Sequence, residues 1–317
     1  MANPIVTALA DVMVGLDTSF ERLSVVPLIG RNREPGVGCI TLDEALASGA
    51  FEVSEVSEAG EVPRLHVTNR GAKPVLLLDG EELVGAKQNR IVNLTILVPP
   101  KTNLQIPVTC VEAGRWHQRG RGFTSSGNAQ YSRARGRKME QVSRSLASTG
   151  EARADQAWIW GDITAKSDRL AVDSGTSEMS AIFKAHQTSV DAYVNALPPV
   201  AGQRGAVFLH DGLPVGIDLF DSEAVFVALL PKLLRSHALD ALDPGDLNAP
   251  RQLGLADFRD QAKSFLGTIA HAAQAGAKLF PTVGLGQAMR VENRRLAAAA
   301  LVLEQHVVHV AAFNLDV

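Results

Sequence analysis

Residues 78–116 read LDGEELVGAKQNRIVNLTILVPPKTNLQIPVTCVEAGRW, a run of aliphatic and β-branched residues that is interrupted by acids, amides and basic residues. Short apolar runs broken by glycine, proline and asparagine are typical of strands. A buried amide or charge without a partner costs about 1–3 kcal/mol. The stretch therefore predicts strands whose polar side chains form either a satisfied structural network or a binding site.

The same pattern extends over residues 23–111 and predicts an antiparallel β unit. Apolar residues at helical spacing within residues 5–16 predict a short helix before it. Thr41, with Glu44 three residues later, predicts a small helix that begins with a capping box. We therefore expect residues 1–117 to form an antiparallel β-rich domain, sandwich or barrel-like, with an N-terminal helix.

The sharpest change in composition falls at residues 115–144, where eight basic residues accompany the single acid Glu140. With glycine and serine between them, they predict a mobile basic loop, suited to a lid over an anionic ligand. Helical stretches follow, and apolar residues keep a 3.6-residue period over residues 179–197. Residues 118–200 are thus expected to form a basic loop and a helical segment. The basic residues are Arg115, Arg119, Arg121, Arg133, Arg135, Arg137, Lys138 and Arg144.

Residues 205–220 read GAVFLHDGLPVGIDLF and predict a hairpin, because Asp211-Gly212 supplies a turn between two apolar strands. Residues 298–313 align with this hairpin without a gap, either through a weak internal duplication or because amphipathic hairpins share one pattern. Residues 201–317 are therefore expected to form an α+β domain with two similar hairpins.

Helices are expected to start at Asp221 or Ser222 and near Phe258, and Pro231 should kink or break the first of them. The fold class that follows is α+β. It combines an N-terminal antiparallel β-rich unit, a helical middle, and C-terminal antiparallel hairpins packed with helices.

Composition narrows the class of protein. The chain has 317 residues, of which 46% are hydrophobic and 21% charged, which is typical of a soluble protein of about two domains. A net charge of −3 disfavours nucleic acid as a partner. Cys39 and Cys110 lie in apolar surroundings that suit reduced thiols. With no signal peptide pattern and no membrane-spanning run, the expected location is the cytoplasm.

Residues 81–93, read as one continuous strand, carry polar side chains on both faces because side chains alternate. Gly85 and Ala86 remove bulk, which permits a bulge or the close approach of a ligand. Two acids offer a general acid or base, two basic residues can neutralise a phosphate or carboxylate, and two amides can bond a base edge. The same groups also suit a buried network that fixes strand register. The two acids are Glu81 and Glu82, the two basic residues are Lys87 and Arg90, and the two amides are Gln88 and Asn89.

A second group of candidates lies where the next strand ends. Glu112, Arg115 and Trp116 bring together an acid, a guanidinium and an indole. These groups can hold a sugar or a base by hydrogen bonding, charge and stacking. We therefore expect them to complete a ligand-binding site with the first group.

The usual cofactor motifs do not occur in the sequence, which has no GxGxxG fingerprint, P-loop, GxSxG elbow or CxxC pair. His306 and His309 are expected on opposite faces of a strand, so we predict no metal site there. The sequence therefore does not identify a cofactor.

The compatible partners are a small anionic ligand and a second copy of the chain. No interaction with a membrane is expected.

Four segments carry a resemblance to a known family: GEELVGAKQNR (80–90), IPVTCVEAGRW (106–116), GIDLFDS (216–222) and LLRSHALDAL (233–242). Over about residues 20–317 the chain resembles the bacterial ARG- and rhodanese/phosphatase-superfamily-associated protein family. The family's name reflects association with ADP-ribosylglycohydrolases and rhodanese-like phosphatases. The resemblance thus implies a role near NAD or ADP-ribose metabolism, and it carries no catalytic assignment.

Two hypotheses of function follow. The first is a cytoplasmic protein that binds a phosphorylated nucleotide-type ligand and, if it is an enzyme, acts as a hydrolase or transferase on an ADP-ribose-like ligand. Glu81 or Glu82 would be the acid or base, the basic candidates would clamp the anion, and Trp116 would stack on it. The second is a non-catalytic interaction or self-assembly module whose polar motif is structural and whose hairpins pair between subunits.

Overall fold

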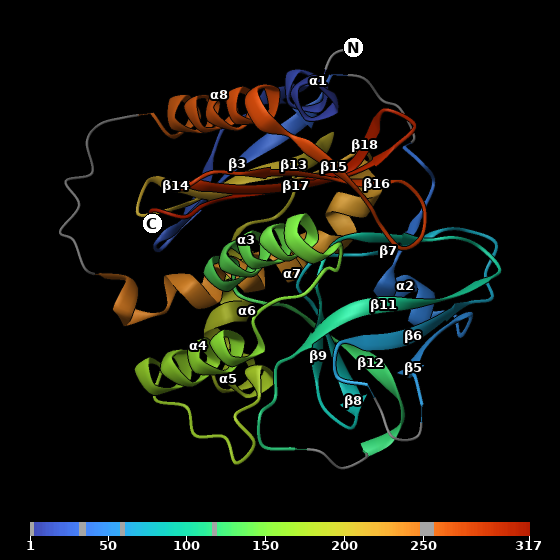
Figure 1. Cartoon of the computed structure of the whole chain (residues 1–317). Coiled ribbons are helices and arrows are strands. Elements are labelled where there is room, and N and C mark those ends of the chain that lie inside the picture. The colour runs from blue at the N-terminus through green and yellow to red at the C-terminus, as the bar shows by residue number, and fades with distance from the viewer. Residues whose placement is uncertain (1–2, 32–35, 58–60, 116–118, 248–256) are drawn as a thin grey trace.

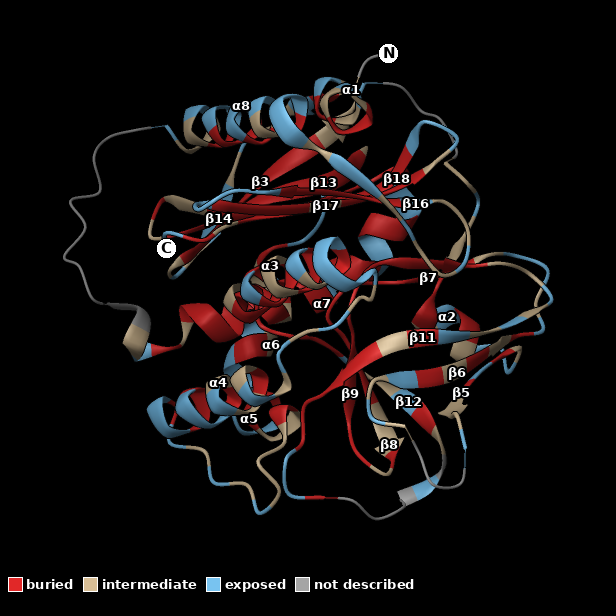
Figure 2. Cartoon of the chain, viewed as in Figure 1, coloured by how far each residue is buried: buried red, intermediate tan, exposed pale blue. Residues whose placement is uncertain are grey.

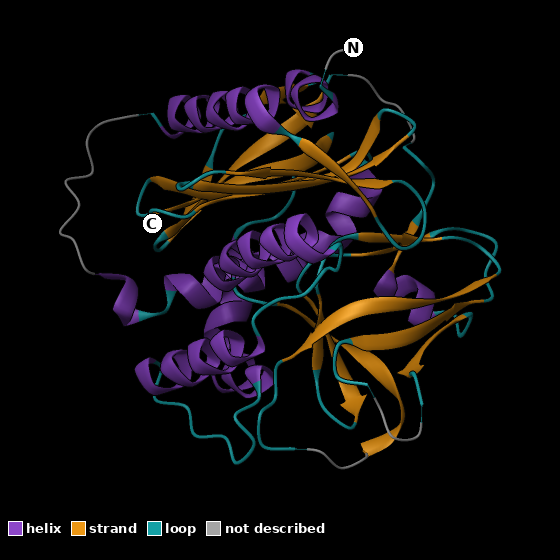
Figure 3. Ribbon diagram, viewed as in Figure 1, coloured by secondary structure: helices purple, strands orange, loops and turns teal. Residues whose placement is uncertain are grey.

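The computed structural model describes residues 3–31, 36–57, 61–115, 119–247 and 257–317. It contains a large sheet and a smaller barrel-like sheet with helices between them (Figures 1 and 3). Nearly all strand pairs are antiparallel, with β4 and β7 as a parallel pair. The α+β fold class predicted from the sequence is therefore confirmed.

The large sheet has nine strands in the order β1-β3-β13-β14-β18-β17-β16-β15, and β2 pairs with the edge of β3. It joins strands from both halves of the chain, since β3 pairs with β13. Its strands are β1 (Val12–Val14), β2 (Thr18–Phe20), β3 (Leu23–Gly30), β13 (Gln203–His210), β14 (Leu213–Phe220), β15 (Lys278–Pro281), β16 (Gln287–Glu292), β17 (Leu296–Leu303) and β18 (His306–Asn314).

The smaller sheet has six strands in the order β12-β8-β9-β11-β6-β5, and its outer strands β12 and β5 approach each other so that it nearly closes. Three further strands, in the order β10-β7-β4, lie beside it. These strands are β4 (Ile40–Thr41), β5 (Phe51–Glu55), β6 (Arg64–Asn69), β7 (Val75–Leu77), β8 (Glu81–Ala86), β9 (Arg90–Val92), β10 (Ile96–Val98), β11 (Thr102–Cys110) and β12 (Arg119–Ala129).

Helices cover both faces of the large sheet, so most of its strand residues are buried (Figure 2). One face packs on α1 and α8, and the other on α3 and α7 (Figure 1). The helices are α1 (Pro4–Ala10), α2 (Leu42–Ala47), α3 (Ser132–Thr149), α4 (Gln156–Arg169), α5 (Met179–Ala185), α6 (Gln187–Ala196), α7 (Glu223–Ala241) and α8 (Phe258–Gly276), with a short 3-10 helix at Pro244–Leu247.

Several local predictions are confirmed. The Asp211-Gly212 turn joins β13 to β14, with φ of 48° and 78° at the two residues. Thr41 and Glu44 form the capping box of α2. Ser222 caps α7, which continues through Pro231. The two similar hairpins lie side by side in the large sheet, because β14 pairs with β18.

Four local predictions are wrong. The N-terminal helix ends at Ala10, and the next residues form β1. Residues 81–93 are a hairpin, β8 and β9, rather than one strand. The helical stretch at residues 179–197 divides at His186 into α5 and α6. Most of the predicted mobile basic loop forms a strand and a helix, β12 and α3, while its residues 116–118 lie outside the described residues.

Two cations of α3 are buried against acids from the large sheet and from the turn before β8. Arg135 donates to both oxygens of Asp218 on β14, each at 3.0 Å, and both side chains are 0% exposed. Lys138 pairs with Asp79 and donates to the carbonyl oxygen of Val92 at 2.8 Å. His309 donates from Nε2 to Asp218 at 3.0 Å, because the Asp218 carboxylate can only accept. Composition alone did not reveal these distant partners.

Replacing Arg135 by Met should lower the free energy of unfolding by about 3–5 kcal/mol, because Asp218 then keeps a buried charge without its main partner. Urea unfolding measures the change. Arg144→Met is the control on the same helix, since that side chain is 64% exposed and its pairs contribute at most about 1 kcal/mol. Equal losses in the two variants would contradict a special role for the buried pair.

Candidate active site

The first family motif forms the β8–β9 hairpin, whose turn needs glycine. Gly85 has φ of +143°, and an added Cβ would lie 2.4 Å from the carbonyl oxygen of Gly122 on β12. Ala86 also has a positive φ, 34°. Backbone conformations of this kind disfavour larger residues, so the Gly-Ala pair fixes where the chain turns. The hairpin pairs Glu82 with Ile91 and Leu83 with Arg90.

The second motif holds this hairpin in place. Arg115 donates from Nε to Glu112 at 2.8 Å, from Nη1 to the carbonyl oxygen of Ala86 at 2.6 Å, and from Nη2 to Asn89 at 3.1 Å. Glu112 also accepts from the backbone N–H of Asn89 at 3.1 Å. Burial favours the neutral form of Glu112, but hydrogen bonds from Arg115 and Asn89 outweigh it and lower its pKa. Glu112, Arg115 and Asn89 thus form a paired ionic network, which we call the motif network.

The segment before α5 packs directly on the motif network. Gly114 donates its backbone N–H to the carbonyl oxygen of Thr176 at 2.9 Å, and an added Cβ at Gly114 would lie 2.9 Å from the Thr176 Cα. Only glycine permits this approach. The Asn89 amide then donates to Glu178 at 3.3 Å and to Ser180 at 3.4 Å. The motif network therefore positions two polar side chains that the sequence did not indicate.

Those two side chains line a cleft of about 840 Å³. The cleft, which we call the motif cleft, lies between β12, the segment before α5, α5 itself and α7. Its size is in the range of about 300–1,000 Å³ that is usual for ligand sites. Its polar and charged lining residues are Ser126, Asn128, Asp173, Ser174, Thr176, Glu178, Ser180, Lys184, Gln187 and Arg235.

Glu82 is 0% exposed and does not line the motif cleft itself, but it lies beneath it, next to the lining residues Ser126, Asn128 and Glu178. Among the described residues Glu82 forms no ion pair, and its polar neighbours are the side chains of Ser126 and Asn128. Burial raises the pKa of Glu82 from 4.5 to about 7; Ser126 and Asn128 oppose the shift, and Glu178 adds to it. A carboxyl with this pKa exchanges a proton near neutral pH, as a general acid or base must.

Glu81 occupies a different place, because its side chain points to the opposite face of β8. It is 0% exposed, forms an ion pair with Lys232 of α7, and accepts from the backbone N–H of Leu78 at 2.8 Å. Lys232 also contacts Asp43 at 2.9 Å. Burial raises the pKa of Glu81, although Lys232 opposes the shift. The two adjacent acids therefore have separate environments, one ion-paired and one not.

The other predicted candidates lie away from the motif cleft or outside the described residues. Gln88 accepts from Arg90 at 3.2 Å, and both side chains are buried. Lys87 is half-buried at the hairpin turn, and its backbone N–H donates to Glu55 at 3.3 Å. Trp116 lies outside the described residues.

The cysteines are both free, and Cys110 is buried. Burial raises the pKa of the Cys110 thiol to about 11, so the thiol is neutral at physiological pH. Among the residues that the structure describes, no three His, Cys, Asp or Glu side chains are placed to hold a metal ion. Within the same residues, no helix has the length and hydrophobicity needed to cross a membrane.

The cleft residues Ser126, Asn128, Glu178, Ser180, Lys184 and Arg235 were not predicted from the sequence. They come from three distant segments, and only Arg235 stands in one of the family segments, LLRSHALDAL (233–242). One signal was available, since Ser126 and Asn128 fall in a polar stretch that follows the second family motif.

The fold and the motif cleft define an α+β protein of two antiparallel sheets with a buried acid beneath a polar site. The chain belongs to a family, because the model of the ARG and Rhodanese-Phosphatase-superfamily-associated Protein domain matches residues 11–313. This match confirms the resemblance seen in the motifs. Searches of curated proteins and of solved structures each gave no match.

Glu82 should make the stability of the protein fall as pH rises. Its pKa is about 7 in the folded protein against an ordinary 4.5, so the folded state holds the proton more tightly. Its contribution is complete below pH 4.5 and is lost as pH rises through 7, by up to about 3 kcal/mol. Unfolding measured at pH 5 and pH 8 should show a smaller fall in Glu82→Gln than in wild type. Identical pH dependence in the two proteins would contradict the raised pKa.

Proposed function

We propose that the motif cleft binds a phosphorylated nucleotide-type ligand linked to NAD or ADP-ribose metabolism, and that Glu82 acts on it as a general acid or base. The observation that carries the proposal is the fully buried Glu82 carboxyl beneath a polar cleft, which has a pKa of about 7 and no ion-pair partner among the described residues. Perturbed acids of this kind cluster at functional sites. An ordinary structural acid would be ion-paired, as Glu81 is.

The lining of the motif cleft suits a ligand with both phosphate and sugar groups. Lys184 and Arg235 supply positive charge for phosphate oxygens. Ser126, Ser180 and Asn128 offer neutral hydrogen-bonding groups for hydroxyls or a base edge. The volume of about 840 Å³ accommodates a nucleotide. The family's name, in which ARG is read as ADP-ribosylglycohydrolase, favours the same ligand class.

The chemistry that Glu82 supports is hydrolysis or group transfer. In its protonated form it donates a proton to a departing oxygen or nitrogen, and in its ionised form it accepts a proton from water or a hydroxyl. Such proton transfer contributes about 10²–10⁴-fold to a rate. Glu178 lies close enough to raise the pKa of Glu82 and gives the site a second carboxylate.

Within this proposal the motif residues have two roles. Glu82 is the catalytic residue, while Glu112, Arg115 and Asn89 are positioning residues that hold the hairpin and Glu178. The anion contacts fall to Lys184 and Arg235, because Arg115 is 1% exposed and donates to groups of the motif network. The two free cysteines support a cytoplasmic location, which is reducing.

A thermal-shift panel with ADP-ribose, NAD, AMP and inorganic phosphate, each with and without Mg²⁺, tests the proposal. A ligand at 100 times its Kd should stabilise the protein by about 2.7 kcal/mol. Lys184→Met should weaken binding about tenfold or more, since a charge-assisted hydrogen bond is lost. Lys263→Met on α8 is the matched control, because its exposed side chain lies far from the cleft lining.

Glu82→Gln separates catalysis from binding. It should keep the ligand-induced shift and lose at least about 100-fold in turnover of the ligand that binds, measured by product release. Unchanged turnover would exclude Glu82 as the acid or base. No shift with any ligand would favour the non-catalytic alternative, in which the exposed edges of β1 and β15 pair between copies of the chain.

A further inference from the structure

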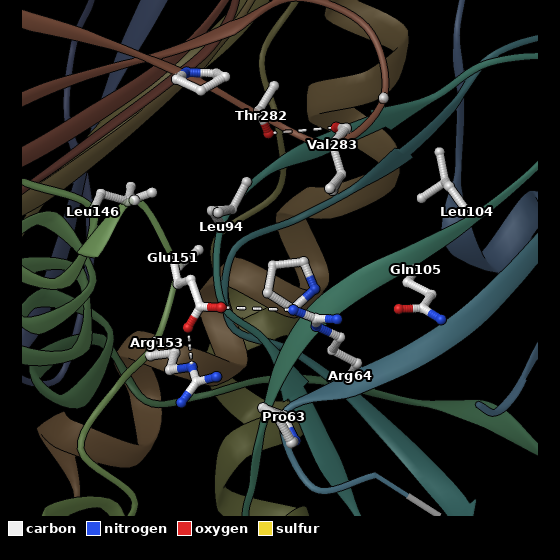
Figure 4. A pocket seen from close by; sticks show the side chains of 15 residues that line it. Pro63, Arg64, Leu94, Leu104, Gln105, Leu146, Glu151, Arg153, Thr282 and Val283 are labelled. Carbon is white, nitrogen blue, oxygen red and sulfur yellow. Dashed lines mark hydrogen bonds and ion pairs between the residues drawn. The ribbon is translucent and has the colours of Figure 1, made fainter. Parts of the chain in front are cut away.

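A second cleft, of about 570 Å³, lies apart from the motif cleft and shares none of its lining residues (Figure 4). It is bounded by β6 and β11 of the barrel-like sheet, the segment after α3, and the connection from β15 to β16. Most of its wall is apolar, including Leu94, Leu104, Leu146 and Val283. We call it the apolar cleft.

Hydrogen bonds hold the walls of the apolar cleft in position. Asn93 donates its side-chain amide to the carbonyl oxygen of Ala152 at 2.9 Å. Leu285 donates its backbone N–H to the carbonyl oxygen of Leu97 at 2.8 Å. Gly284, which precedes Leu285, has φ of +84°, and an added Cβ there would lie 2.4 Å from the carbonyl oxygen of Leu97. The cleft is thus a formed part of the fold that does not depend on a ligand to shape it.

Charged side chains gather at one end of the apolar cleft (Figure 4). Arg153 contacts Glu151 at 2.7 Å, and Arg64 contacts the other Glu151 oxygen at 3.7 Å. Two guanidinium groups therefore share one carboxylate in the lining. The contact of Arg64 with Glu61, which lies outside the lining, is 3.9 Å long. Both contacts of Arg64 exceed hydrogen-bonding length.

Arg64 is the group that points to a ligand. Among the described residues its guanidinium makes no hydrogen bond, although it lines an apolar cavity and is 44% exposed. A guanidinium has five donors and pairs with a carboxylate through two parallel bonds. The positive charge faces an apolar wall, which matches a molecule with a carboxylate at one end and hydrocarbon at the other.

We propose that the apolar cleft binds a small amphipathic carboxylate, with the carboxylate on Arg64 and the hydrocarbon against Leu94, Leu104 and Val283. The cavity volume is within the range of about 300–1,000 Å³ for small-molecule sites, and the lining has their usual character, mostly apolar with a few polar groups. The site is independent of the proposed function, because Glu82 and the motif network take no part in it.

Calorimetric titration of the full chain with decanoate, kept below its micelle concentration, tests the proposal. Decanoate should bind, 1-decanol should bind at least tenfold more weakly, and acetate should not bind measurably. Arg64→Met should weaken decanoate binding at least tenfold and leave decanol binding unchanged. Glu151→Gln should strengthen decanoate binding, because it removes the carboxylate that competes for both arginines.

Arg70→Met is the matched control on the border of the same strand: Arg70 is 59% exposed, pairs with Glu52, and lies outside the lining. It should bind decanoate as wild type does. Leu104→Gln should weaken decanoate and decanol alike, and Glu82→Gln should change neither. Three results would each overturn the proposal. They are equal affinity for decanoate and decanol, decanoate binding that Arg64→Met does not weaken, and no binding of decanoate to the wild-type protein.

Discussion

The pairing of two buried cations on α3 is the constraint on which the arrangement of the two sheets depends. Arg135 reaches Asp218 in the large sheet, and Lys138 reaches Asp79 and the carbonyl of Val92 beside the barrel-like sheet. Burial favours the neutral form of Asp218, yet Arg135 and His309 lower its pKa to about 2. A buried charge that loses its partner is strongly destabilising. A shift of either sheet along α3 would separate one of these buried ion pairs and is therefore unfavourable.

Some local signals in the sequence predicted the local structure correctly. The Asp211-Gly212 turn and the Thr41 capping box each depend on residues within a few positions, and both are as expected. The basic segment was misread because its order depends on acids 59 and 83 residues away, at Asp79 and Asp218. Composition shows that charges are present, but only the fold shows whether they are solvated or buried.

The sequence predicted part of the candidate site, namely the motif residues, but not the residues that line the cleft. The polar motif identified Glu82 and its neighbours because acids and amides are rare in apolar strands. It did not distinguish Glu82 from Glu81, whose different environments arise from α7 and the segment before α5. The cleft residue Glu178 comes from the segment before α5 and Lys184 from α5 itself, and neither segment has a sequence link to the motif. The sequence therefore predicted the carboxyl group of the site, whereas it did not predict the cavity beside that group.

The large sheet also sets the order in which the chain can assemble. Strand β3 ends at Gly30, and its partner β13 begins at Gln203, so more than half of the chain lies between them. Pairing across such a separation is slow because a long loop must close first. During synthesis the barrel-like sheet, built from residues 51–129, is complete before β13 exists. Until then the N-terminal strand has an open edge, a stage at which a nascent chain is exposed to aggregation and to chaperones.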